Sequence, residues 1–169
     1  MPGPLKHTVT YVNSTRFVFL GSKDGDLRDF RQVEAIFEKY KPTYVIHLAA
    51  RVGGLFANMQ DKVGFYEDNM AINLNVVKCC HQFKVKTLLS ALSTCIYPDN
   101  YRPSGWPAGE NYAMVEADIH KGPPHPSNEG YAYAKRMLEM HSRIYNEQHG
   151  TDFRCFVPTN LYGKHDVYG

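Results

Sequence analysis

The chain has 169 residues, of which 43% are hydrophobic and 13% aromatic, and this suits one domain with a packed core. Its 19 basic and 17 acidic residues are interspersed and give a formal net charge of +2, so no basic patch for nucleic acid or an anionic membrane stands out. No apolar run reaches the roughly 20 residues of a bilayer span, and the N-terminus has no secretory signal, so we expect a cytoplasmic protein with a small-molecule partner.

The first half of the chain alternates between strand and helix patterns. Residues 16–22 predict a strand closed by Gly21, and residues 26–41 predict a helix that ends at Pro42. The near-continuous apolar run at 43–50 is typical of a strand buried on both faces of a parallel sheet. Residues 51–60 predict a loop with two glycines, and a long helix is expected from about 62 to 83.

The second half continues the alternation after a strand predicted at 86–94. Residues 97–128 hold six of the ten prolines, and they predict a long surface loop beyond the end of that strand. A helix is expected from about 130 to 150, followed by a strand and a turn over 152–163. Strands that alternate with helices predict an α/β fold, a Rossmann-like doubly wound parallel sheet that binds ligands beyond the carboxyl ends of its strands.

The residues that follow these strands are the candidates for chemistry. Tyr131 and Lys135 lie four positions apart on the helix at 130–150, so they share one face. The lysine charge is expected to favour the phenolate and to lower the tyrosine pKa, which would suit proton transfer. Ser93 adds a hydroxyl at a strand end. The same spacing also arises by chance in ordinary surface helices, so the pattern alone leaves both interpretations open.

Cysteine and histidine residues give no metal-binding pattern. Cys79 and Cys80 are adjacent, whereas Cys95 and Cys155 are isolated, which matches neither a zinc site nor a disulfide scaffold. Reduced thiols and no metal are therefore expected. His47 lies within an apolar strand and is expected to be a core residue, and His165 receives no catalytic role.

Four motifs, in this order, carry a resemblance: "HLAARVGGLFANM" (47–59), "LSTCIYP" (92–98), "NEGYAYAKRM" (128–137) and "PTNLYGKHD" (158–166). They resemble the extended short-chain dehydrogenase/reductase family, and more narrowly its epimerase-reductases that act on GDP-linked keto-deoxy sugars. The match runs from about Phe17 to Asp166. The longer motifs are far more specific than the tyrosine and lysine spacing, and they favour an NADP-dependent oxidoreductase and epimerase of nucleotide-sugar metabolism.

The resemblance also implies roles for individual residues. Ser93, Tyr131 and Lys135 would form the reductase triad, with Tyr131 as proton donor, and Cys95 would be the acid/base of epimerisation. The substrate would be a GDP-sugar and the cofactor NADP(H). The implied cofactor-binding residues, besides Tyr131 and Lys135, are Lys23, Asp26, Leu27, Leu48, Ala49, Ala50, Asn69, Pro158, Thr159, Asn160 and Leu161.

The chain departs from the family pattern in several places. It contains no G-x-x-G-x-x-G turn for the cofactor pyrophosphate, and its first matching segment resembles the family's second strand. We therefore expect a single incomplete nucleotide-binding domain over 1–169, without the first strand or the C-terminal substrate domain. The segment at 100–119 is longer than in the family, and residues 1–15 are atypical.

Three further expectations follow from these departures. Residues 7–13 would fill the vacant first-strand position of the sheet and run antiparallel. Activity of the chain by itself would be severely reduced or absent, because the pyrophosphate contacts are lost. The alternative is a non-catalytic module that associates with a full-length partner, since family members are typically homodimers through the helices at about 62–83 and 130–148.

Overall fold

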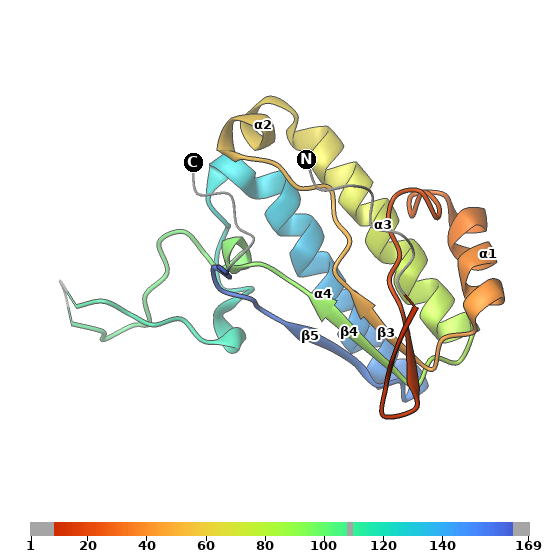
Figure 1. Cartoon of the computed structure of the whole chain (residues 1–169). Coiled ribbons are helices and arrows are strands. Elements are labelled where there is room, and N and C mark those ends of the chain that lie inside the picture. The colour runs from red at the N-terminus through yellow and green to blue at the C-terminus, as the bar shows by residue number, and fades with distance from the viewer. Residues whose placement is uncertain (1–8, 108–109, 164–169) are drawn as a thin grey trace.

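The structure is a computed structural model that describes residues 9–107 and 110–163. Its sheet is parallel and has three strands in the order β3-β4-β5. These strands are β3 (Tyr44–His47), β4 (Thr87–Ala91) and β5 (Phe153–Phe156). His47 lies opposite Ser90, and Ser90 lies opposite Cys155. Helices connect the strands (Figure 1), so the α/β fold with a parallel sheet is confirmed.

The N-terminal strands form a separate hairpin. β1 (Val9–Val12) and β2 (Thr15–Val18) pair antiparallel in their own two-stranded sheet. Asn13 and Ser14 both have positive φ angles, 46° and 63°, as a tight two-residue hairpin turn requires. The prediction that residues 16–22 join the parallel sheet is therefore wrong, because the turn pairs this segment with its immediate neighbour.

The hypothesis for residues 7–13 is corrected by the same hairpin. Its described residues do form an antiparallel strand, but the partner is β2 and the pair does not join the three-stranded sheet. Residues 7 and 8 lie outside the described part of the chain. Closing a two-residue turn fixes few dihedral angles, whereas the position beside β3 requires a long-range contact.

Three long helices pack against the sheet. α1 (Phe30–Tyr40) begins at Asp29, whose side chain accepts a hydrogen bond from the Arg31 amide. α3 (Lys62–Gln82) is capped in the same way by Asp61, and α4 (Glu129–His149) ends at Gly150 with φ 63°. A short helix, α2 (Leu55–Gln60), lies inside the segment predicted to be a loop. Among these described helices, none combines the length and apolar character needed to cross a bilayer.

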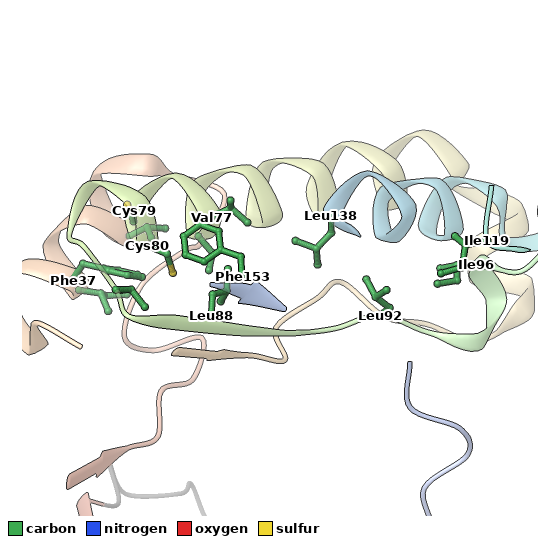
Figure 2. Packing of buried hydrophobic residues seen from close by; sticks show 14 residues of the cluster. Phe37, Val77, Cys79, Cys80, Leu88, Leu92, Ile96, Ile119, Leu138 and Phe153 are labelled. Carbon is green, nitrogen blue, oxygen red and sulfur yellow. The ribbon is translucent and has the colours of Figure 1, made fainter. Parts of the chain in front are cut away.

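The core lies between the helices and one face of the sheet (Figure 2). Val77 on α3, Leu138 on α4 and Leu88 on β4 all have zero exposure. Alternate residues of β3 point to the opposite face of the sheet, where Tyr44 and Ile46 are 57% and 60% exposed. The described helices therefore cover only one face, so the second helical layer of a doubly wound sheet is not among the described residues.

The predicted surface loop at 97–128 extends away from the helices and the sheet (Figure 1). Its described part holds two short 3-10 helices, η2 (Glu116–Asp118) and η3 (Pro126–Asn128). The Trp106 and Tyr112 rings meet with centroids 4.9 Å apart, and Tyr112 donates a hydrogen bond to buried Asp118 at 2.7 Å. The loop thus has a small packed cluster of its own.

Candidate active site

The carboxyl end of β4 is where the first two candidate residues lie. Ser93 follows the strand and caps η1 (Thr94–Ile96), accepting a hydrogen bond from the Cys95 amide with an Oγ–N distance of 3.4 Å. The prediction extended the strand to residue 94, but β4 ends at Ala91, three residues earlier. Ser93 and Cys95 are therefore held on one short turn that packs against α4.

The first turns of α4 present Tyr131 and Lys135 to that turn. Close packing of the α3 and α4 N-termini holds them there. A Cβ atom on Gly130 would overlap the Lys62 carbonyl oxygen, so only glycine permits this approach. Lys62 Nζ and Glu129 Oε1 also form an ion pair at 2.6 Å. Sequence spacing alone did not indicate this contact.

The ammonium group of Lys135 points toward the end of β4. Its side chain is 1% exposed, and Nζ donates a hydrogen bond to the Ala91 carbonyl oxygen at 2.8 Å. Nζ also lies 5.8 Å from the centroid of the Tyr131 ring. Burial lowers the Lys135 pKa to about 8, despite partial compensation by Cys95 and Cys155.

The expected fall in the Tyr131 pKa is wrong. Burial, followed by the charge of Cys95, raises the pKa of Tyr131 to about 12. The i, i+4 spacing did place the lysine beside the ring, but its ammonium bonds to Ala91 instead of the phenol. A buried phenol ionises less readily than an exposed one, so Tyr131 is protonated at neutral pH and is equipped to donate a proton.

Cys95 is held among these same groups. Burial raises the pKa of its thiol, while a hydrogen bond with Ser93 and the charges of Lys135 and Arg136 act in the opposite direction. The structure thus brings Ser93, Cys95, Tyr131 and Lys135 together at one strand end. A hydroxyl, a thiol, a phenol and an ammonium there can bind a carbonyl oxygen and exchange protons next to it.

The segment after β3 carries the next group of predicted residues. Leu48 is 64% exposed, and Ala49 and Ala50 follow it. Asn69, fully buried on α3, accepts a hydrogen bond from the Arg51 amide at 2.9 Å and donates to the Arg51 carbonyl at 3.0 Å. This side chain fixes the backbone that leaves the strand.

The segment before α1 carries Lys23, Asp26 and Leu27. Lys23 is exposed, whereas Asp26 accepts hydrogen bonds from Arg28, and this contact lowers the Asp26 pKa to about 2. Arg28 also contacts Asp68 on α3 at 3.1 Å. The structure does not bring these residues into contact with Tyr131 or Lys135, and they lie on a separate segment of the candidate site.

The remaining predicted positions follow β5 or lie in the core. Pro158 is half-buried, and Thr159, Asn160 and Leu161 are exposed beyond the strand. His47 is 3% exposed and its Nε2 bonds to Asn73 Oδ1 at 3.0 Å, as expected of a core residue, and burial lowers its pKa to about 4. His165 lies outside the described residues. Within those residues, no cluster of three or more potential metal ligands occurs, and all four cysteines are free.

Two arginines near the site were missed by the sequence analysis. Arg51 forms ion pairs with Asp61 at 2.7 Å and with Asp68 at 3.1 Å. Arg136 is 3% exposed on α4 and donates to backbone carbonyls. Surface arginines are common, so their burial and partners leave no signal in a single sequence.

Comparison with known proteins identifies the family of this chain. The model of the family described as "NAD dependent epimerase/dehydratase family" matches residues 5–169. The chain belongs to this family. The resemblance inferred from the four motifs is thereby confirmed.

Several individual members of the family are similar to this chain. A GDP-L-fucose synthase of Dictyostelium discoideum is 53% identical over 152 residues, covering 90% of this chain and 45% of that protein. The GDP-L-fucose synthase of Escherichia coli K12 is 37% identical over 143 residues, covering 85% and 42%. A crystal structure of a GDP-L-fucose synthetase from Naegleria fowleri bound to NADP has a TM-score of 0.78 and 52% identity, covering 90% of this chain and 44% of that one. The chain thus spans less than half the length of these relatives.

Proposed function

We propose that this chain carries the proton-transfer site of a GDP-4-keto-6-deoxy-D-mannose epimerase-reductase, the activity of a GDP-L-fucose synthase. The observation that carries the proposal is the meeting of Ser93, Cys95, Tyr131 and Lys135 at the end of β4, where Lys135 bonds to Ala91. The identity to GDP-L-fucose synthases supports the substrate. No comparison supports the alternative of a non-catalytic module.

The residues present fit part of an NADP cofactor. Lys135 and Tyr131 would hold the nicotinamide ribose, and the segment after β5 would lie near the nicotinamide. Lys23, Asp26 and Leu27 would lie near the adenine end, and residues 48–50 would follow the nucleotide, supported by Asn69. The 169-residue sequence contains no G-x-x-G-x-x-G turn whose backbone amides could bind the cofactor pyrophosphate. The cofactor of this function supplies the hydride for reduction of C4.

Reduction of the keto group needs a proton as well as a hydride. Tyr131 would donate its phenolic proton to the C4 oxygen, while the Ser93 hydroxyl donates a hydrogen bond to the same oxygen. The high pKa of Tyr131 keeps it protonated until that oxygen becomes strongly basic. Lys135, fixed by the Ala91 carbonyl, would stabilise the phenolate that remains.

Epimerisation needs a group that removes and returns protons at C3 and C5. The C4 carbonyl makes these protons acidic, because the electron pair left by each proton is delocalised onto the C4 oxygen. The Cys95 thiolate would take the proton and become the thiol. A water molecule would then give a proton to the opposite face and invert the centre, and the hydroxide left behind would take the proton back from the Cys95 thiol. Burial raises the Cys95 pKa, and the hydrogen bond with Ser93 and the charges of Lys135 and Arg136 act in the opposite direction.

Solvent-deuterium exchange tests this function without the cofactor. The keto sugar would be incubated with the protein in D₂O, and deuterium at C3 and C5 followed by mass spectrometry and NMR. We expect exchange above the buffer rate that Cys95→Ser reduces by about a hundredfold or more. Cys155→Ser is the matched control and should leave exchange unchanged. Exchange that is equal in wild type and Cys95→Ser would overturn the proposed role.

We also propose that the outer faces of α3 and α4 form a homodimer. Support comes from exposed apolar side chains on both helices, including Leu74 at 43% and Ile144 at 39%. Sedimentation should find a dimer that Leu74→Glu weakens. A wild-type monomer at all accessible concentrations would contradict this assembly.

A cytoplasmic setting is the last part of the proposal. Its support is that all four cysteines are free thiols, with Cys79 and Cys80 fully buried. Reduced thiols are typical of that compartment. Fractionation of cells that express the chain would test this, and recovery in a membrane or secreted fraction would contradict it.

A further inference from the structure

A buried arginine beside the candidate site has no acidic partner among the described residues. Arg136 is 3% exposed, and it follows Lys135 on α4. Its Nη2 atom is buried and has no hydrogen-bond partner there. Burying a guanidinium without a carboxylate is costly, so its remaining contacts must serve the structure or the site.

Those contacts join both ends of the long loop to α4. Arg136 Nε donates to the Ile96 carbonyl at 2.6 Å, where the chain leaves η1 and enters the loop. Its Nη1 donates to the Gly122 carbonyl at 2.7 Å, on the returning limb. The two limbs also meet directly, since the Asp99 amide donates to the Pro123 carbonyl at 3.0 Å.

The two hydrogen bonds of the Arg136 guanidinium also fix the turn that carries Cys95. Ile96 is the last residue of η1, and Cys95 precedes it. On the other side of the turn, Lys135 bonds to Ala91 at the end of β4. Two adjacent cations of α4 therefore hold the backbone before and after Ser93 and Cys95.

We propose that Arg136 is a positioning residue that fastens both limbs of the 97–128 loop to α4 and thereby holds Cys95 in the site. A planar guanidinium suits this role because its donors point in fixed and different directions, so one side chain can reach two carbonyl oxygens. Its charge, together with that of Lys135, also favours the ionised form of the Cys95 thiol. The attachment of the loop to α4 does not depend on the proposed function. Its importance for catalysis by Cys95 does rest on that function.

Three variants separate the effect of the two hydrogen bonds from the effect of the positive charge. Arg136→Met removes the hydrogen bonds and the charge, whereas Arg136→Lys keeps a positive charge but cannot reach both carbonyl oxygens. Arg143→Met is the matched control, because Arg143 is an exposed arginine on the same helix that pairs with Glu139 and Glu147. Circular dichroism establishes that each variant is folded.

Proteolysis reports the fastening of the loop. Endoproteinase Glu-C can cleave after Glu110 and Glu116, both within the loop. We expect cleavage there to rise about tenfold in Arg136→Met, because two charge-assisted hydrogen bonds no longer oppose local opening. Cleavage should also rise, by a smaller factor, in Arg136→Lys, because lysine cannot make both bonds. Cleavage at the wild-type rate in Arg136→Lys, or an equal rise in Arg143→Met, would overturn the fastening.

Alkylation of Cys95 reports the effect on the thiol. The rate with iodoacetamide would be followed against pH by mass spectrometry of the Cys95 peptide, normalised to its plateau at high pH so that accessibility cancels. Tyr131, Lys135 and Arg136 are the titratable and charged groups of α4 near Cys95, and Ser93 bonds to it. In Arg136→Met the pH at which alkylation of Cys95 is half-maximal should rise, and the normalised alkylation rate at pH 8 should fall about threefold. Arg136→Lys should keep the wild-type midpoint.

An unchanged Cys95 midpoint in folded Arg136→Met would overturn the electrostatic part. If Arg136→Met does not fold, Arg136→Lys still decides the fastening. Neither assay contains a sugar or a cofactor. These results therefore stand even if the chain fails to exchange deuterium into the keto sugar, and failure of this inference would leave that exchange unaffected.

Discussion

Lys135 donates a hydrogen bond to the carbonyl oxygen of Ala91 at 2.8 Å, from a side chain that is 1% exposed. This contact joins α4 to the carboxyl end of β4. It also turns the ammonium group away from a direct bond with the Tyr131 phenol. The helix thereby places its cation under the strand end where Ser93 and Cys95 begin the next turn.

The first prediction concerns pH. The folded-state pKa of Lys135 is about 8, below its ordinary value of 10.5, so between these values the unfolded chain binds the additional proton. The free energy of unfolding should therefore rise with pH across that window through this group, by about 3 kcal/mol. Chemical denaturation of wild type and Lys135→Met would measure it.

The quantity to follow against pH is the free energy of unfolding of wild type minus that of Lys135→Met. Cys79 and Tyr131, whose pKa values are raised, make an opposite contribution above about pH 9, and both proteins share it because Lys135 is not among the causes of those shifts. The stability of wild type relative to Lys135→Met should increase from pH 8 to 10.5. A difference that stays constant or shrinks would contradict the buried, cationic Lys135.

Asn69 provides a second prediction. Its side chain bonds to both backbone groups of Arg51 and to the Phe65 carbonyl, and it is fully buried. Asn69→Ala should lower the free energy of unfolding by about 2 to 3 kcal/mol, since buried groups lose their partners. Asn75→Ala, which removes more exposed bonds to Leu27 and Arg28, should cost about 1 kcal/mol. Equal losses in urea denaturation would argue against the special role of Asn69.

A third prediction concerns the approach of α3 to α4. Gly130→Ala would drive a methyl group into the Lys62 carbonyl oxygen, so it should cost about 2 to 4 kcal/mol of stability by overpacking. Gly21→Ala meets nothing within 4 Å, and it should change stability by less than about 0.5 kcal/mol. Thermal unfolding of both variants tests this, and a neutral Gly130→Ala would mean that the helices stand further apart.

Strongly patterned elements were the ones that the sequence predicted well. α3 and α4 follow long helical patterns, and their observed bounds differ from the prediction by at most one residue at each end. The six-residue α2 was missed because so short a segment shows little more than one turn of periodicity. β2 was placed in the wrong sheet because strand patterns do not identify their partners.

The sequence identified most residues of the candidate site, but it did not predict the contacts that these residues make. Motifs indicated Ser93, Cys95, Tyr131 and Lys135, and the fold brings them to one strand end. The spacing of Tyr131 and Lys135 identified a shared helix face, but burial and the Ala91 carbonyl decide the pKa values. Arg136 could not be distinguished from an ordinary surface arginine until the loop it fastens was in view.

The reductase assignment to Tyr131 can be tested by deuterium transfer. The protein, at substrate-level concentration, would be incubated with the keto sugar and millimolar NADPH that carries deuterium at C4 of the nicotinamide. The high concentrations offset the missing pyrophosphate contacts, which are worth roughly 1.5 to 3 kcal/mol each. We expect a slow, sub-stoichiometric product with deuterium at C4 of the sugar, lost in Tyr131→Phe and retained in Tyr133→Phe. Folded wild-type protein that forms no deuterated product, or Tyr131→Phe that forms as much as wild type, would contradict it.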